Sequence, residues 1–531
     1  SSINDGAAAL VLARESTAKE LGVKPMARIV GQRLDERCGP VVGGGHSLVQ
    51  CLDPRIGLTD GDGAGLFGGV HILPFFVPYD GADAGFDPID HTQVDARLGS
   101  WGDVAALAVD VPVMGDAIVN HLSAASVQFT DYLALGSKSA HEGLFLTFDA
   151  VFPAGASERE LLAVYRPRPS PPYTAVTRAD GSRRLLWTTF SPQQIDIDVE
   201  HAQGRAYLES VLHKLAAGGV SMVRLDAVGY AIKRAGSGCF MLPETFAFIE
   251  SLAASCHGLG LEVLVEVHSY YRRQIEIAAR VQWVYDFALP PLLLHALLFK
   301  SCQALTHWIG VRPVNAVTVL DTHDGIGIID IGPDASDPLS SPGLVSPEQL
   351  ERLVETIHAN SGGDSRAATG TAASNLDLYQ VNCTYFDALG RDATAYLIAR
   401  AVSFFVPGVP QVYYVGLLAG GNDMALMRRT GVGRDINRHH FSLDEIDTAL
   451  ARPVVQQLLW LIKLRNSHAA FAGRFRCEPL GPAELALHWA HGAEHTSLHL
   501  DFLRTQATVR WSTPAGTEQW PVGAPLPAAL P

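Results

Sequence analysis

The sequence has little cysteine and a shortage of positive charge, and each shortage excludes a class of protein. Its seven cysteines are scattered and form no C-x-x-C pair, which argues against a disulfide framework and a zinc cluster and favours a reducing compartment. Lys and Arg number 40 against 55 Asp and Glu, so the formal net charge of −15 disfavours nucleic acid as a partner. An anionic co-substrate therefore needs a local cluster of positive charge.

Long uninterrupted apolar runs are also scarce. The run 401–421 is broken by Pro407 and Pro410, so we expect a buried strand with its loops and no membrane span. Charged residues surround the short apolar stretch near the start, which is unlike a signal peptide. These patterns predict a cytoplasmic protein without a membrane partner. What is present, 47% hydrophobic residues in 531, is ample for a large folded core.

From about residue 69, short apolar runs alternate with helical stretches. The runs are HILPFF (71–76), VMGDAIVNH (113–121), VSMVRLDAV (220–228), LEVLVEVHS (261–269), WVYDFAL (283–289), AVTVLDTHD (316–324) and GVPQVYYVG (408–416). Near-continuous apolar strands that alternate with helices predict a parallel sheet covered on both faces. Seven such units favour an α/β fold of the (β/α)8, or TIM barrel, type.

Interruptions of this alternation divide the chain. Residues 122–200 show little helical periodicity and residues 325–390 are rich in Gly, Ser, Asp and Ala, so both are expected to be inserted subdomains or lids. Short alternating segments after 470 predict a small C-terminal β domain. The predicted organisation is an atypical segment 1–68, barrel parts 69–121, 201–324 and 391–470, inserted subdomains 122–200 and 325–390, and a β domain 471–531.

Ionisable residues gather at the C-terminal ends of the predicted strands, the face where barrels place their active sites. Asp226, Glu266 and Asp324 end three different strands. Two facing carboxylates are what glycosyl transfer requires, one as nucleophile and one as general acid and base. Arg224 lies two residues before Asp226 on the same strand face and can keep it ionised. Metal binding and a structural ion-pair network are the alternatives for this trio.

Four strings resemble the ordered motifs of the α-amylase superfamily of retaining glycosidases and transglycosidases. They are DAIVNH (116–121), VRLDAVGY (223–230), EVHSYY (266–271) and VLDTHDGIG (319–327). Within that superfamily the sequence resembles the sucrose phosphorylases. This second resemblance is carried by residues 71–95, YRPRP (165–169), SNLDLYQVN (374–382) and NDMALMRRTGVGRDINRHHFS (422–442), and it covers about residues 69–470.

The resemblance implies a role for each matching position. Asp226 would be the nucleophile that forms a β-glucosyl-enzyme, Glu266 the acid and base, and Asp324 the stabiliser of the transition state. The substrate-binding positions it implies are Asp83, Phe86, His121, Phe190, Arg224, His268, His323, Asp377, Gln380 and Arg434. Asp83 and Arg434 would close the far end of a pocket for one glucose.

The resemblance also implies the reaction and its co-substrate. Sucrose and inorganic phosphate would give α-glucose 1-phosphate and fructose with retention, and Arg168 and Tyr379 would bind the phosphate. No cofactor and no metal are expected, and the histidines 439, 440, 488, 491 and 495 are expected to be packed or solvated. The family includes dimers, but no segment of the sequence identifies an interface.

The first 68 residues depart from the family. Residues 3–31 resemble a fragment of a thiolase, and only residues 47–57 faintly resemble the missing first barrel strand. The first β/α unit is therefore expected to be altered or replaced. Two alternatives to sucrose phosphorolysis stay open. One is phosphorolysis of a related α-glucoside, namely sucrose 6′-phosphate, glucosylglycerol or glucosylglycerate. The other is an inactive fusion or carbohydrate-binding protein.

Overall fold

The structure is a computed structural model that describes residues 67–79, 85–167, 171–334, 338–372 and 380–527. It also describes the backbone of three short strands, β1 (Ala8–Ala9), β2 (Val23–Pro25) and β3 (Gly57–Asp60). Most of the thiolase-like segment 3–31 and residues 47–56, the expected source of a first strand, lie outside these residues.

A parallel sheet of eight strands forms the centre of the protein and confirms the predicted α/β class. Its hydrogen-bonded order is β1-β18-β15-β14-β13-β12-β7-β4. The strands are β4 (Val70–His71), β7 (Val113–Ile118), β12 (Met222–Asp226), β13 (Glu262–Val265), β14 (Trp283–Asp286), β15 (Ala316–Thr318) and β18 (Val409–Val412), with β1 at one end. Every residue of β7 is buried, as expected for a strand with helices outside and side chains inside the barrel.

Two expectations about the first strands need correction. The run HILPFF is not one strand, because only Val70–His71 pair with β7. Pro74 has no N–H to donate to a ladder, and the chain beyond it forms β5 (Phe76–Pro78), antiparallel to β6 (Pro88–Val94). The strand beside β18 is β1, through the pairs Ala8↔Gln411 and Ala9↔Val412, so it comes from the segment that resembles a thiolase.

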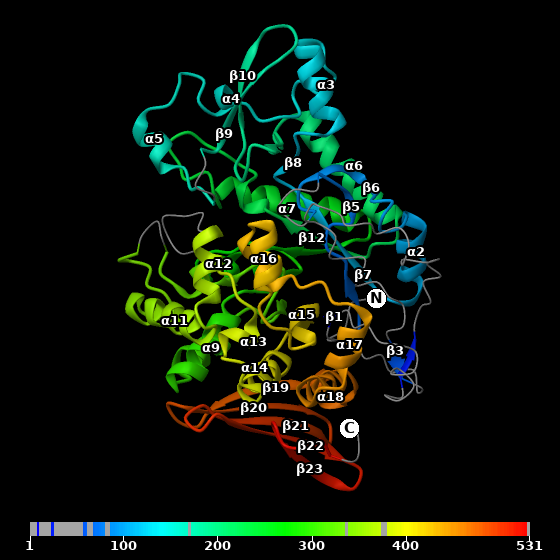
Figure 1. Ribbon diagram of the computed structural model, residues 1–531, viewed down its shortest axis with the longest axis vertical. Helices are drawn as coiled ribbons and strands as arrows, with labels where there is room; N and C mark the ends of the chain where they lie inside the picture. Colours follow the sequence, from blue (N-terminus) through cyan, green and yellow to red (C-terminus); the bar gives the residue numbers. More distant parts are fainter. Residues whose placement is uncertain are drawn as a thin grey trace.

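Helices cover the outside of the sheet (Figure 1). They are α2 (Trp101–Asp110), α6 (Ala202–Ala217), α7 (Pro243–Gly258), α8 (Tyr271–Ala278), α9 (Leu289–Phe299), α10 (Gln303–Val311), α14 (Ala393–Phe405) and α18 (Pro453–Ser467). The Asp392 carboxylate accepts the Thr394 and Ala395 N–H groups at the start of α14, an N-cap that fixes where this buried helix begins. Among the described helices none is long and apolar enough to span a membrane.

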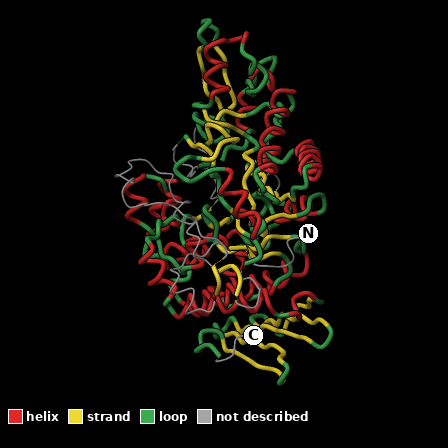
Figure 2. Tube along the Cα trace, turned by 90° about the vertical axis from the view of Figure 1, so that its right-hand side faces the viewer, coloured by secondary structure: helices red, strands yellow, loops and turns green. Residues whose placement is uncertain are grey.

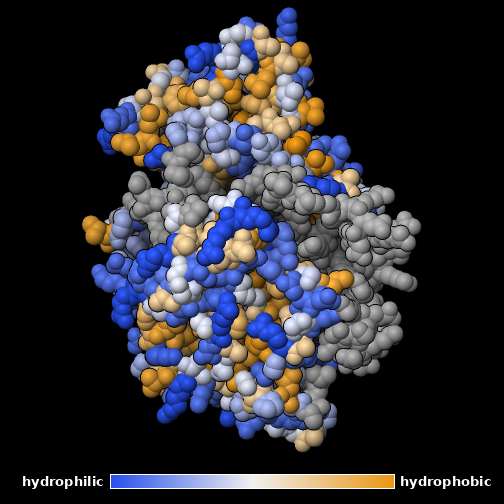
Figure 3. Space-filling view, in the orientation of Figure 1, coloured by the Kyte–Doolittle hydropathy of each residue, from blue (hydrophilic) through white to orange (hydrophobic). Residues whose placement is uncertain are grey.

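The insertion after β7 forms the lobe at the top of Figure 1. It contains β8 (His121–Ser123), α3 (Val127–Leu135), η2 (Gly136–Lys138), α4 (Phe148–Val151), α5 (Glu158–Ala163), β9 (Tyr173–Thr177), β10 (Arg183–Trp187) and β11 (Gln194–Asp196). Its helices are short, which is why the sequence of this insertion shows little helical periodicity. Apolar side chains reach its surface (Figure 3), and Leu135 and Leu162 are exposed.

The second insertion is more helical than its composition predicts. It contains β16 (Ile326–Gly327), η4 (Ile329–Ile331), α11 (Pro347–Asn360), α12 (Asp364–Ala372), β17 (Gln380–Val381) and α13 (Tyr385–Ala388). A capping box at Ser346 and Gln349 starts α11. After β18 come α15 (Tyr414–Leu417), α16 (Met424–Thr430), η5 (Gly433–Asn437) and α17 (Leu443–Leu450).

The C-terminal part is a five-stranded antiparallel sheet, as predicted, and lies at the bottom of Figures 1 and 2. Its strands follow the 3-10 helix η6 (Ala469–Ala472) and are β19 (Arg474–Pro479), β20 (Glu484–His491), β21 (Glu494–Asp501), β22 (Gln506–Thr513) and β23 (Gly516–Pro521). Trp511 and Trp520 pack against Trp460 of α18, with ring centroids 5.1 and 4.9 Å away. This aromatic contact joins the sheet to the barrel, opposite the lobe formed by the first insertion (Figure 1).

Candidate active site

Arg224 is the centre of the charged cluster at the carboxyl ends of the barrel strands. It lies on β12 beside Asp116 of β7, because the register pairs these two residues. Its Nη1 lies 2.6 Å from Asp116 Oδ1 and 2.8 Å from Asp226 Oδ1. Its Nη2 lies 3.9 Å from Glu266 Oε1. One buried guanidinium therefore contacts three carboxylates, which come from three neighbouring strands. Two of these carboxylates, Asp226 and Glu266, are predicted catalytic residues.

Asp116 and His71 belong to this cluster, although neither was predicted from the sequence to be a site residue. His71 Nε2 donates to Asp116 Oδ2 at 2.9 Å, and Gln411 Nε2 donates to His71 Nδ1 at 3.3 Å. Complete burial by itself would raise the pKa of Asp116, but His71 and Arg224 outweigh it and lower that pKa below its usual value. Asp116 therefore stays ionised beneath the site and helps to orient Arg224.

The Asp116→Asn variant is expected to lower the free energy of unfolding at pH 7 by about 3 kcal/mol, because it leaves Arg224 with an incomplete set of buried counter-charges. The pKa of Asp116 is lower in the folded protein than in the unfolded chain, where it is about 3.9. Its stabilising contribution is thus fully present above that pH and is lost as the pH falls through the folded value. Urea unfolding should show the gap between wild type and variant narrowing below about pH 4. A gap that stays constant with pH contradicts this role.

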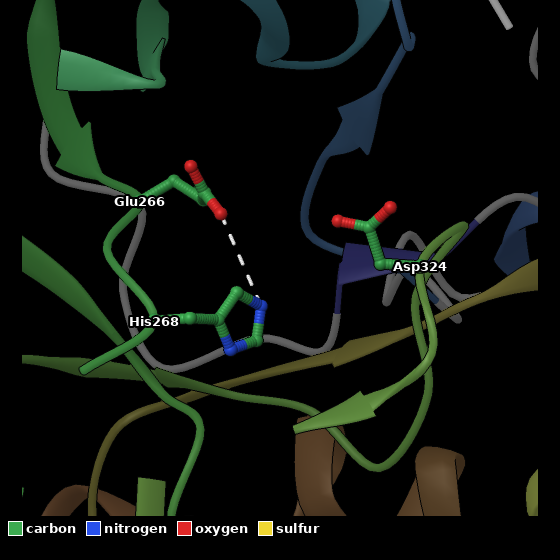
Figure 4. A group of neighbouring side chains, drawn as sticks. All are labelled: Glu266, His268 and Asp324. Carbon is green, nitrogen blue, oxygen red and sulfur yellow. Dashed lines mark ion pairs between the residues drawn. The ribbon is translucent and has the colours of Figure 1, made fainter. Parts of the chain in front are cut away.

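Glu266 follows β13 directly, and its carboxylate points into the site (Figure 4). Its Oε2 accepts the N–H of Ala227 at 3.3 Å, and its Oε1 lies 3.9 Å from His268 Nε2. Ala227 has the left-handed backbone conformation, with φ of 55°, directly after Asp226. The turn that ends β12 therefore presents Asp226 and also donates a backbone hydrogen bond to Glu266.

Asp324 lies in the segment between β15 and β16, beside two arginines and a histidine. Arg434 Nη1 lies 2.7 Å from its Oδ1, and Arg438 Nη2 and His323 Nε2 lie 3.9 and 3.8 Å from the same atom. Burial would raise the pKa of Asp324, but Arg434, His323 and Arg438 outweigh it and hold that pKa far below its usual value. Arg434 thus contacts a catalytic candidate directly, and its expected neighbour Asp83 lies outside the described residues.

Aromatic rings and histidines from the first insertion and from two other segments line part of the site. Phe86 stacks on His323 with centroids 4.6 Å apart, and His121 contacts Phe190 at 5.2 Å. His121 Nε2 lies 2.9 Å from the carbonyl oxygen of Phe86 and so donates to it. Burial lowers the pKa of His323 to about 3, which leaves a neutral ring beside Asp324. Flat apolar faces beside neutral donors suit the face and hydroxyl groups of a sugar.

His268 and Gln380 meet beside Glu266 and Arg434. Gln380 Nε2 lies 3.2 Å from His268 Nε2, and Arg434 Nη2 donates to Gln380 Oε1 at 3.4 Å. Gln380 begins β17 in the second insertion, so this insertion contributes to the site. Three other predicted residues, Arg168, Asp377 and Tyr379, lie outside the described residues.

Glu266, His268 and Asp324 offer atoms that all lie within 4.8 Å of one another (Figure 4). By distance alone such a group could hold a metal ion. Each member, however, already has a protein partner, in Ala227, Asp330 and Arg434 respectively.

Two of the C-terminal histidines that were expected to be packed or solvated contact carboxylates. His439 lies between Asp423 and Glu445, and His488 contacts Glu478.

The site as a whole can carry out acid–base and nucleophilic chemistry on a small polar ligand. Asp226 and Glu266 approach the same guanidinium from adjacent strands, and retaining glycosyl transfer requires two carboxyl groups about 5 Å apart. Asp324 adds a third negative charge that can stabilise a cationic transition state. Side chains fill the barrel beneath these groups, so the chemistry takes place at one face.

Comparison with known proteins identifies close relatives. The chain is 57% identical over 452 residues to sucrose phosphorylase of Agrobacterium vitis, which covers 85% of this chain and 92% of that protein. It is 55% identical over 456 residues to sucrose phosphorylase of Bifidobacterium adolescentis, which covers 86% and 90%. No family model matches the chain.

Solved structures agree with the fold. The crystal structure of sucrose 6F-phosphate phosphorylase from Thermoanaerobacter thermosaccharolyticum superposes with a TM-score of 0.77 at 36% identity, over 86% of this chain and 91% of that one. An α-amylase from H. orenii gives a TM-score of 0.56 at 13% identity, over 85% of this chain and 83% of that one, which supports the barrel fold alone. The predicted (β/α)8 class is confirmed.

Proposed function

This chain belongs to the sucrose phosphorylase family, and we propose that it transfers the glucosyl group of sucrose to inorganic phosphate. The products are α-D-glucose 1-phosphate and D-fructose. The observation that supports this most strongly is the position of Asp226 and Glu266 on either side of Arg224, in a chain 57% identical to a sucrose phosphorylase.

In the first half of the reaction, the Asp226 carboxylate attacks the anomeric carbon of the glucosyl group. Glu266 gives its proton to the fructosyl oxygen as that bond breaks. Arg224 keeps Asp226 ionised through the contact of 2.8 Å. Asp324, held ionised by Arg434, stabilises the positive charge that develops on the sugar. The result is a covalent β-glucosyl-enzyme.

In the second half, a phosphate oxygen attacks the same carbon, and the electron pair of the broken bond returns to Asp226. Two successive inversions give net retention, which is why the product is the α anomer. Phosphate is already an anion and needs little help from a base, but it needs a cation in a protein of net charge −15. Arg168 and Tyr379 are proposed for this contact, and Asp377 and Gln380 for fructose or phosphate.

The glucose pocket is proposed to be closed at its far end, so that one sugar residue fills it. Phe86 and Phe190 would stack on the substrate, and His121 and His323 would form hydrogen bonds with its hydroxyl groups. Asp83 together with Arg434 would complete the closed end. No cofactor is proposed, because side chains supply both the nucleophile and the acid. Phosphate acts as the co-substrate.

Phosphate-dependent release of α-glucose 1-phosphate from sucrose tests this function, with glucose measured in parallel as the hydrolysis product. We expect the phosphate ester to form only when both sucrose and phosphate are present. Sucrose 6′-phosphate, glucosylglycerol and glucosylglycerate serve as alternative donors, because relatives are named for each of them, at 38%, 39% and 33% identity respectively. Preferred turnover of one of these donors would move the assignment to another acceptor. A folded protein that is inactive on every donor would contradict it.

A further inference from the structure

The ring of His268 is held in place by a fully buried aspartate that the proposed mechanism does not use. His268 lies between β13 and α8, and Asp330 lies in η4, 62 positions further along the chain. His268 Nδ1 is 2.8 Å from Asp330 Oδ2. The other oxygen of Asp330 accepts the Ser269 N–H at 3.1 Å and Gln274 Nε2 at 2.9 Å. These three donors fix the direction of the Asp330 carboxylate.

The opposite edge of the same ring faces the catalytic candidates. His268 Nε2 lies 3.9 Å from Glu266 Oε1 and accepts from Gln380 Nε2 at 3.2 Å, and Phe287 stacks on the ring with centroids 3.7 Å apart. Burial raises the pKa of Asp330, but the Ser269 N–H and Gln274 Nε2 donors favour its ionised form, so we assign the proton between His268 and Asp330 to Nδ1. It follows that Nε2 is the nitrogen that gains or loses a proton, and that it does so beside the acid and base of the reaction.

The charges around His268 favour its protonated form. Burial would lower its pKa, but the Asp330 carboxylate at Nδ1, with Glu266 and Asp324 on the site side, outweighs burial and raises that pKa above its usual value. These three carboxylates face the ring from η4, from the end of β13 and from the segment after β15. Asp330 is the one that touches it, so its removal should change the proton affinity of the ring most.

We propose that Asp330 is a positioning residue: by holding the Nδ1 proton of His268, it leaves Nε2 as the nitrogen that accepts from Gln380 when neutral and, once protonated, donates to the anionic acceptor that attacks the glucosyl-enzyme. This inference rests on the proposed function and deepens it. A cationic donor at Nε2 favours attack by phosphate, which is an anion, over attack by neutral water. In that step the phosphate oxygen bonds to the anomeric carbon, the bond to Asp226 breaks and its electrons return to the carboxylate. His268 keeps its proton throughout.

The tautomer and pKa of His268 test this proposal without any turnover. In protein labelled with ¹⁵N-histidine, the His268 signals are assigned by their loss in His268→Gln. We expect Nδ1 to stay protonated while Nε2 titrates, and Asp330→Asn to lower the pKa of His268 by about one unit or more. Asp286→Asn is the matched control, because Asp286 is equally buried but pairs with Arg312 at 2.6 Å, and it should leave His268 unchanged. Wild-type His268 with its proton on Nε2 alone, or an unchanged pKa in Asp330→Asn, overturns the proposal.

Activity measurements then ask whether Asp330 acts through His268. Asp330→Asn should lower the ratio of phosphorolysis to hydrolysis by about tenfold at neutral pH. It should also move the high-pH loss of phosphorolysis to lower pH, because protonated His268 disappears as the pH rises through a lowered pKa. In a His268→Gln background the same change should have little further effect on the ratio. Equal losses of phosphorolysis and hydrolysis, with no movement of the pH profile, overturn the proposal. If the wild type does not use sucrose, the proposed function fails, while the tautomer measurement still decides the role of Asp330.

Discussion

Asp226→Asn is expected to lower kcat/KM for sucrose phosphorolysis by roughly five orders of magnitude, because removal of a covalent nucleophile removes the whole two-step route. The amide matches the carboxylate in shape and leaves Arg224 its contact with Asp116 at 2.6 Å. Stability should therefore change less than activity. Steady-state release of α-glucose 1-phosphate measures the effect, and thermal unfolding checks the fold.

The matched control for this variant is Asp286→Asn, at the end of the barrel strand β14. Asp286 is as buried as the site residues but contacts Arg312 and Trp308, outside the active site. Asp286→Asn should reduce stability and largely keep the activity of the protein that remains folded. If Asp226→Asn keeps more than about a hundredth of the wild-type kcat/KM, Asp226 is not the nucleophile.

Glu266→Gln is expected to lower kcat for sucrose by roughly a thousandfold, because the fructosyl oxygen then leaves without a proton. The effect depends on the leaving group, which makes the prediction specific. With α-glucosyl fluoride, whose leaving group needs no general acid, the variant should form the glucosyl-enzyme at a rate close to that of the wild type. Rates of fluoride and fructose release measure the two cases.

A different pattern in this comparison would contradict the role of Glu266. An equal loss on both donors would mean that Glu266 acts in binding or in structure and not as the acid. Asp324→Asn is the informative comparison, because a residue that stabilises charge in the transition state should slow both donors alike. Arg434 keeps its contact with the amide oxygen in that variant, so the site should stay assembled.

The residues at the ends of the barrel strands could be predicted from the sequence, and the residues beneath them could not. Asp226 and Glu266 stand out because each ends an apolar run. Asp116 lies inside a fully buried strand, and only the register of β7 against β12 brings it to Arg224. Its one local signal is that it begins the string DAIVNH.

Asp330 neither ends an apolar run nor begins a recognisable motif, so the sequence does not single it out. It lies in a long insertion, and its partner His268 is 62 positions away, so no local pattern relates the two. The insertions were also hard to predict in their internal structure, because helices such as α4 and α5 are too short to show an apolar stripe. The run HILPFF was predicted as one barrel strand because it is apolar throughout. Pro74 lies within it and cannot donate to a ladder, so only Val70–His71 pair with β7.

The measurement that tests the central claim most directly is mass spectrometry of the trapped intermediate. Glu266→Gln incubated with α-glucosyl fluoride in the absence of phosphate is quenched, digested and compared with untreated protein. We expect the peptide that contains Asp226 to gain the mass of one glucosyl residue, and added phosphate to remove it as α-glucose 1-phosphate. A glucosyl group found on any other residue, or an unmodified protein that still releases fluoride, would contradict a mechanism through Asp226.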